Sequence, residues 1–169
     1  MKYSCRKACL LLAILLFIIC AQGCKKDVQV ITCPFTEITW ENNLEDIRET
    51  AGELLETRDS VYDGKSYLYS KEYKGHDGTV YYIFDDEENL VSMAWGYSST
   101  STQELNALKD DIYNELVETY GECDYDTELG GGSVWYTDGG NIVLFSIDTA
   151  EYKALQLNFV HPSVAEKQE

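Results

Sequence analysis

The chain has few basic residues, and this shortage excludes one large class of partner. Thirteen Lys and Arg stand against thirty Asp and Glu in 169 residues, which gives a formal net charge of −17 at pH 7. Nucleic-acid binding depends on basic groups that release counterions from phosphate. We therefore expect no nucleic-acid partner. A charge of this size suits a solvated surface, and it would attract a cationic partner.

Catalytic signatures are also missing. The two histidines are His76, in a predicted turn, and His161, beside Pro162. Neither accompanies a Ser or Cys nucleophile motif. Gly130 to Gly132 lacks the Lys-Ser/Thr of a phosphate-binding loop and is better explained as a turn. The sequence predicts a protein that is not an enzyme and that holds no cofactor.

Metal-binding patterns are incomplete in the same way. Asp124, Asp126 and Glu128 match the start of an EF-hand loop, but Leu129 stands where its Gly belongs and Trp135 where its bidentate Glu belongs. No Cys/His spacing suits zinc. The acidic run Asp85 to Glu88 is typical of a charged hairpin tip. We predict no metal site.

No apolar run is long enough to cross a membrane comfortably. The longest, Ala8 to Ala21, has 14 residues and follows the basic start at Lys2 to Lys7, as in a signal peptide. It ends in Ala21-Gln22-Gly23-Cys24, which resembles a bacterial lipoprotein lipobox. That motif prefers Leu three residues before the cysteine, where Ala21 stands here. The resemblance implies lipidation of Cys24, and ordinary cleavage after Gly23 is the alternative.

These features predict export and a simple domain organisation. Residues 1–23 would be the signal peptide, and residues 24–34 a tether from the lipidated Cys24. Residues 35–162 would form one globular domain of two halves, about 35–98 and 99–162, before a frayed tail at 163–169. The lipid would anchor the protein to the bacterial cell membrane, on the outer face of the cytoplasmic membrane or on the periplasmic side.

Cysteine use leaves a question open. Cys5, Cys9 and Cys20 lie in the signal segment, so Cys33 and Cys123 remain once Cys24 is acylated. In an exported protein two remaining cysteines suggest a disulfide, which would close a long loop. Two unpaired thiols are the equal alternative.

An internal repeat organises the rest of the chain. The stretch from Gly78 to Tyr97 matches, without a gap, the stretch from Gly140 to Phe159. Each contains two strand-like runs around an acidic turn, with Asp86 matching Asp148. An amphipathic pattern with helical spacing precedes each copy.

The pattern predicts an α+β fold of two αβββ repeats, with an antiparallel sheet and both helices packed on one face. Thr39 would cap the first helix, and Ser101 with Glu104 would form a capping box for the second, which Gly121 would end. The predicted helices and strands have these ranges: helices 40–56 and 101–120, strands 67–73, 79–84, 90–97, 133–137, 141–147 and 153–160.

The predicted sheet has one face without a helix. Met93, Trp95, Leu155 and Leu157 would face the helices. The opposite face would hold the candidate interaction residues, which mix aromatic and small side chains: Tyr82, Phe84, Ser92, Ala94, Gln156 and Asn158. Such a surface is typical of a contact patch, although a loop, a second copy or sheet curvature would also explain it.

A lipobox followed by a duplicated helix-plus-sheet unit resembles the superfamily of β-lactamase-inhibitory protein. It is also similar to the SmpA/OmlA (BamE-like) lipoproteins and to PepSY-like domains. The inhibitor family has a disulfide within each repeat, which Cys33 and Cys123 do not reproduce. The resemblance implies a membrane-anchored, non-catalytic module that binds a protein through the open sheet face. The alternative is a receptor or sensor for a small molecule or divalent cation in the cell envelope.

Overall fold

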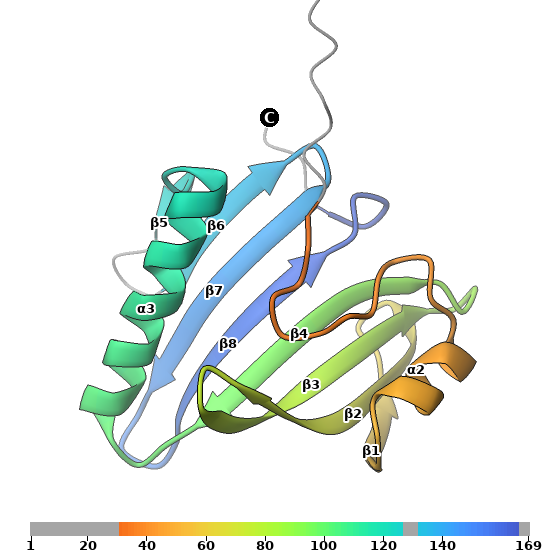
Figure 1. The fold of residues 1–169 in the computed structure, drawn as a ribbon, viewed down its shortest axis with the longest axis horizontal. Coiled ribbons are helices and arrows are strands. Elements are labelled where there is room, and N and C mark those ends of the chain that lie inside the picture. Colours follow the sequence, from red (N-terminus) through yellow and green to blue (C-terminus); the bar gives the residue numbers. More distant parts are fainter. Residues whose placement is uncertain (1–30, 127–131, 166–169) are drawn as a thin grey trace, which may run out of the picture.

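The computed structural model describes residues 31–126 and 132–165 (Figure 1). The predicted signal peptide, Cys24, Glu128 to Gly131 and the tail residues 166–169 lie outside them. The elements are, in chain order, α2 (Leu44–Thr50), β1 (Leu54–Asp59), β2 (Asp63–Tyr73), β3 (His76–Asp85), β4 (Leu90–Ser98), α3 (Thr102–Tyr120), β5 (Tyr125–Asp126), β6 (Gly132–Thr137), β7 (Gly140–Asp148) and β8 (Lys153–Val160). Over these described ranges no helix is long and apolar enough to span a membrane.

All eight strands form one antiparallel sheet in the order β1-β2-β3-β4-β8-β7-β6-β5. The expected α+β fold of two αβββ repeats, with two helices covering one face, is wrong. Strands dominate the described chain, each half contributes four of them, and α2 is too short to cover the strands of its half (Figure 1). The unpredicted strands are β1 and β5, which lie at the two edges of the sheet.

The first helix ends early because of Gly52. Helix α2 has seven residues, and Gly52 follows its C-cap at φ +87°, a left-handed conformation that stops helices. Leu54 and Leu55, which fit a helical spacing in the sequence, instead begin the exposed strand β1. Asn43, rather than Thr39, is the N-cap, and it forms a capping box with Asp46.

The second helix follows the sequence pattern closely. Ser101 is its N-cap, with its hydroxyl accepting the amide of Glu104 at 3.2 Å, and Gly121 ends it at φ +88°. The Glu104 carboxylate does not return to the cap. It instead accepts hydrogen bonds from Tyr97 and Ser99, at 2.7 and 2.6 Å. The buried residues of α3 are those with helical spacing: Leu105, Leu108, Ile112 and Leu116.

The register of the sheet creates two different faces. On the covered face, two rows of mostly large side chains cross six strands: Tyr67, Tyr82, Met93, Phe159, Ile142 and Trp135, and then Tyr69, Val80, Trp95, Leu157, Leu144 and Ser133. Most of these residues belong to the hydrophobic core. We call the other side, whose residues alternate with these, the open face.

Residues 31–38 form a strap that crosses the covered face before α2 (Figure 1). Ile31, Cys33, Phe35 and Ile38 are buried in the core. The Phe35 ring packs edge-on against the rings of Phe159 and Tyr73, at centroid distances of 5.8 and 6.0 Å. The segment predicted as a free tether is therefore, from Ile31 onward, part of the folded domain.

The hairpin between β2 and β3 ties the two halves together. Lys74 and Gly75 make its turn, both at positive φ. The Lys74 ammonium lies 2.7 Å from Asp111 and 2.6 Å from Glu115, both on α3. This hairpin therefore contacts the helix that covers the other half of the sheet.

Of the two alternatives left open for Cys33 and Cys123, the structure has the unpaired thiols: both cysteines are free. Cys33 is buried in the strap, with its sulfur 4.0 Å from that of Met93. Cys123 follows α3 and lies 3.7 Å from the Tyr113 hydroxyl. Burial raises the pKa of the Cys33 thiol well above its usual value, which suppresses the reactive thiolate.

Candidate interaction face

Two of the predicted interaction residues lie on the wrong side of the sheet. Tyr82 and Phe84 are 2% and 3% exposed and belong to the core. Tyr82 lies directly opposite Met93, so both side chains point to the covered face. Its hydroxyl is 2.7 Å from the Thr36 hydroxyl in the strap. Tyr82 and Phe84 are therefore core residues and do not belong to the interaction face.

The other four predicted residues do share the open face. Ala94 lies opposite Asn158, while Ser92 and Gln156 occupy the neighbouring rows. Their side chains are mostly satisfied within the sheet. The Ser92 hydroxyl donates to the Phe159 carbonyl at 3.1 Å, and the Gln156 amide donates to Asn158 at 2.7 Å. Ser92 and Ala94 are buried, at 3% and 0% exposure, while Gln156 and Asn158 are partly exposed. Together the four form a small-residue floor of which only Gln156 and Asn158 are accessible.

Two aromatic side chains that were not among the predicted residues flank this floor. Tyr81 lies opposite Ala94, and Phe145 lies opposite Gln156. The Tyr81 ring leans over Gly96, where a Cβ would stand 3.3 Å from a ring carbon. Burial raises the pKa of Tyr81. A glycine at this position is what lets a large ring lie flat on the sheet.

Charge is absent from the centre of the open face. Three rows cross β2, β3, β4, β8, β7 and β6, and none of their residues is ionisable at neutral pH: Ser66, Ile83, Ser92, Val160, Asn141 and Tyr136; Leu68, Tyr81, Ala94, Asn158, Val143 and Val134; Ser70, Thr79, Gly96, Gln156, Phe145 and Gly132. Charges begin at the rim, with Glu72 and Asp77 beyond the third row and with Glu56 and Arg58 on β1.

One end of the open face is hollowed. A cavity of about 270 Å³ lies between Gly96, Phe145, Ile147, Tyr152 and Gln156. Ile147 and Tyr152 at its edge are 42% and 55% exposed. A hollow with exposed apolar edges is suited to receive a protruding side chain.

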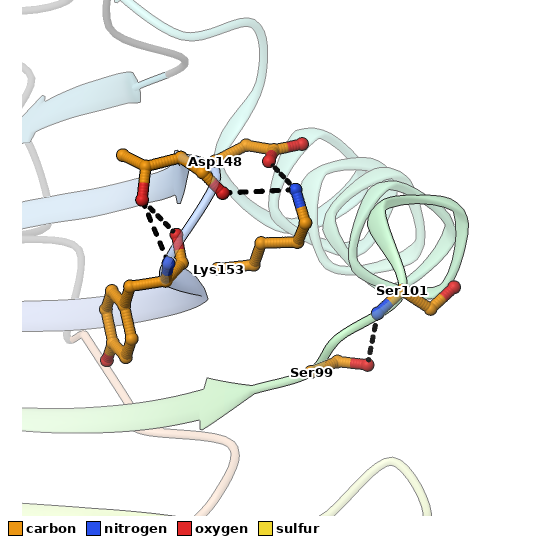
Figure 2. Close-up of polar contacts among 6 residues, drawn as sticks. Ser99, Ser101, Asp148 and Lys153 are labelled. Atoms are coloured by element: carbon orange, nitrogen blue, oxygen red, sulfur yellow. Dashed lines mark hydrogen bonds and ion pairs between the residues drawn. The ribbon is translucent and has the colours of Figure 1, made fainter.

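The turn beside this hollow is held in place by polar contacts (Figure 2). Lys153 forms an ion pair with Asp148 and also donates to the Thr149 carbonyl at 3.3 Å. The Thr149 hydroxyl donates to the Tyr152 carbonyl and accepts its amide, each at 2.9 Å. The Ser98 hydroxyl donates to the Tyr152 hydroxyl at 3.2 Å, which gives the exposed ring a defined place on the rim.

The histidines take structural positions. The His76 imidazole lies 3.4 Å from Glu104 and packs on the Tyr97 ring at 4.7 Å. The Ser99 hydroxyl donates to the Glu104 carboxylate and not to an imidazole. These bonds from Ser99 and Tyr97 hold the pKa of the Glu104 carboxyl below its usual range. The Glu104 carboxylate thus links the first turn of α3 to Tyr97 of β4. His161 packs against Trp40 at 5.4 Å.

In the acidic turn between β3 and β4, the Asp85 carboxylate forms hydrogen bonds within the turn itself. Asp85 accepts the amides of Asn89 and Glu87, at 2.8 and 3.1 Å. Asp124 accepts the amide of Tyr136 at 2.7 Å. Among residues 31–126 and 132–165, no group of three or more Asp, Glu, His or Cys is placed to hold a metal ion.

A second cavity, of about 540 Å³, lies between α2, the start of β2 at Asp63 and the end of β3 at Asp85.

Comparison of the chain with protein-family models, with curated proteins and with solved structures finds no match.

Proposed function

We propose that the protein is a non-catalytic binding module that holds another protein on its open face. The observation that carries this proposal is the uncharged, aromatic-flanked floor in a chain of net charge −17. The centres of protein interfaces are depleted in charged residues and enriched in tyrosine and other aromatic residues. A solvated sheet face in so acidic a chain would instead carry acidic side chains throughout.

The chemistry of the partner follows from the distribution of charge. Glu72 and Asp77 stand at the rim, and the whole molecule is strongly acidic. A partner with a basic rim around an apolar protrusion would complement this arrangement. Opposite charges at the rim accelerate encounter more than they strengthen the complex. The association rate should therefore fall steeply with added salt, while the dissociation rate changes little.

The test is capture from cell-envelope extracts with matched variants. Tyr81→Ala/Phe145→Ala removes the two flanking rings, while the control Val61→Ala changes a residue that is 87% exposed in the β1–β2 turn. We expect wild type and control to bind the same purified partner and the double variant to bind at least about tenfold more weakly, as for hot-spot residues. Equal affinity of the double variant and the control would refute the use of the open face.

We also propose that this module is exported and anchored to the bacterial cell membrane through a lipid on Cys24. The support is the short apolar run, its basic start and the lipobox-like Ala21-Gln22-Gly23-Cys24. Mass spectrometry of the mature N-terminus tests this. A diacylglyceryl or triacyl Cys24 is the expected result, and an unmodified residue there, or a retained signal peptide, would refute it.

The larger cavity is the basis of a second candidate, a receptor for a small cationic molecule or divalent cation. Its lining includes Asp63, Asp86 and Glu88, along with the Tyr67 and Phe84 rings, but no three carboxylates among the described residues are grouped to hold a metal ion. It also includes Arg48 and Lys65, and Lys65 is paired with Asp59. Titration with calcium alone, followed by thermal unfolding, tests the divalent form of this function. A stabilisation that Asp86→Asn/Glu88→Gln abolishes would support it, and no shift with calcium would remove it.

A further inference from the structure

Strand β1 is an open edge of the sheet. Within the described residues it pairs with β2 alone, and all six of its residues are exposed. Leu54 and Leu55 are 43% and 57% exposed. In Figure 1 the strand lies at the outer border of the sheet. An edge strand offers a row of unpaired backbone N–H and C=O groups that can pair with another strand.

The charges of β1 form a self-complementary pattern. Glu56 and Arg58 lie on the open-face side, opposite Leu68 and Ser66, with 2.6 Å between their charged groups. Two copies related by a two-fold axis must pair antiparallel, with residues of the same face opposite each other. Centring such a pair on Thr57 places Glu56 opposite the Arg58 of the second copy, twice.

Neighbouring registers are opposed by charge. Centring on Glu56 places two carboxylates opposite each other, and centring on Arg58 places two guanidinium groups opposite each other. Like charges directly across a strand pair are destabilising. The bulge between Leu54 and Glu56 further limits regular pairing to residues 56–59. Like-charge repulsion therefore disfavours these neighbouring registers of a β1 pair, whereas the register centred on Thr57 pairs opposite charges.

We propose that β1 is a homodimer interface in which two copies pair antiparallel about Thr57. This contact joins the two sheets into one. Because the paired charges must share a face, both open faces then lie on the same side of the joined sheet. The interface uses a different surface from the proposed partner-binding floor, so either can fail without the other.

Charge exchange between two variants tests the register. Glu56→Arg places only basic groups at these positions, and Arg58→Glu places only acidic groups. The purified proteins are compared by sedimentation or light scattering at about 0.15 M salt, where the screening length is about 8 Å and net repulsion is reduced. Far-UV circular dichroism verifies that each exposed substitution leaves the fold intact.

We expect the wild type to dimerise and each single variant to dimerise at least about tenfold more weakly, because both cross-strand pairs become repulsive. An equimolar mixture of the two variants should regain dimers, since each basic group of the Glu56→Arg copy then faces an acidic group of the Arg58→Glu copy. Each variant loses the Glu56–Arg58 ion pair within its own copy. Only attraction between the two different copies therefore explains this recovery. The control Glu53→Arg, before β1, should behave as wild type.

Three outcomes would overturn the proposal. They are a wild type that stays monomeric up to its solubility limit, single variants that dimerise as tightly as the wild type, and a mixture no tighter than its components.

Discussion

Over strands β5 to β8, one helix of 19 residues supplies four buried side chains, whereas over β1 to β4 the seven-residue α2 supplies one, Ile47. The strap compensates for this difference, because Ile31, Cys33, Phe35 and Ile38 enter the same core. One sheet is therefore covered by regular helix over β5 to β8, and by a short helix together with the strap over β1 to β4, with the strap also packing on Phe159 of β8. The lengths of the helix and of the strap, rather than a repeated helix-plus-sheet unit, determine how each half of the sheet is covered.

The strands of the two halves differ to match their covers. Strands β2 and β3 place rings on the covered face, among them Tyr67, Tyr69 and Tyr82, while β7 and β8 place mostly aliphatic side chains there and one ring, Phe159. Larger side chains fill the space that a short helix leaves. Close packing of this kind is required because interiors leave few voids larger than a water molecule.

Removing the main contact of the strap should have the largest effect. Phe35 is 2% exposed and packs on Phe159 and Tyr73. We expect Phe35→Ala to lower the free energy of unfolding by about 3–5 kcal/mol, as measured by urea denaturation. Glu37→Ala, an exposed change in the same strap, is the control and should stay within about 0.5 kcal/mol. A loss below about 1 kcal/mol for Phe35→Ala would show that the strap does not close this half.

The two helices can be compared through one isoleucine each. Ile47 and Ile112 are 0% and 1% exposed. We expect Ile47→Ala and Ile112→Ala each to cost about 2–5 kcal/mol in thermal or urea unfolding, through lost burial and the cavity left behind. The exposed change Asn106→Ala serves as control on α3. If Ile47→Ala behaved like the control, α2 would contribute nothing to the cover of its half.

The helix caps give a smaller and more local comparison. Asn43→Ala and Ser101→Ala each remove a side-chain acceptor from the first turn, at 2.8 Å from Glu45 N and 3.2 Å from Glu104 N. Each should cost about 0.5–2 kcal/mol. Residue-resolved amide hydrogen exchange should show weaker protection in α2 than in α3, since a seven-residue helix depends more on its ends. Equal protection of the two helices would contradict this.

The corresponding hairpin turns should respond alike to acid and differently to salt. Amide hydrogen bonds, chiefly from Asn89, hold the pKa of Asp85 below its usual range, whereas Lys153 does so for Asp148. A depressed carboxyl pKa stabilises the fold above the unfolded value, near about 3.9, and the contribution is lost as pH falls through the folded value.

The test compares Asp85→Asn and Asp148→Asn by melting temperature across pH. Both should melt below the wild type at neutral pH, and both differences should shrink below about pH 4. High salt should reduce the Asp148→Asn difference more, because its partner is a charge rather than backbone amides. A pH-independent difference would show that neither carboxylate acts through its ionised form.

The sequence predicts most of the strands and α3, because their alternation or helical spacing is strong and bounded by turns. It fails for α2, where Ala51, Leu54 and Leu55 continue a helical spacing past the glycine that ends the helix. This error in the length of α2 made the predicted fold class wrong, and it left β1 unpredicted. Burial of the strap was also missed, because Ile31, Cys33 and Phe35 alternate with Thr32 and Pro34 outside any predicted helix or strand.

The residues of the open face were predicted in part. Ser92, Ala94, Gln156 and Asn158 alternate with bulky residues, so their side was correct. In β3 both sets of alternate positions are apolar, and a register error of one residue exchanges the two faces. The bulge between Ile83 and Phe84 sets the true register, and it brings Tyr81 rather than Tyr82 to the open face. No sequence pattern marks that bulge.

Strands β4 and β8 form the central pair of the sheet, so the sheet cannot be completed until β8 has been synthesised. Strand β8 is the last of the eight to leave the ribosome, yet it lies between β4 and β7. Its contacts, such as Phe159 with Met93, join residues far apart in sequence, and such contacts form slowly. Until residues 153–160 emerge, β4 and β7 are both open edges of hydrophobic strands. The nascent chain is thus most prone to aggregate just before this strand appears.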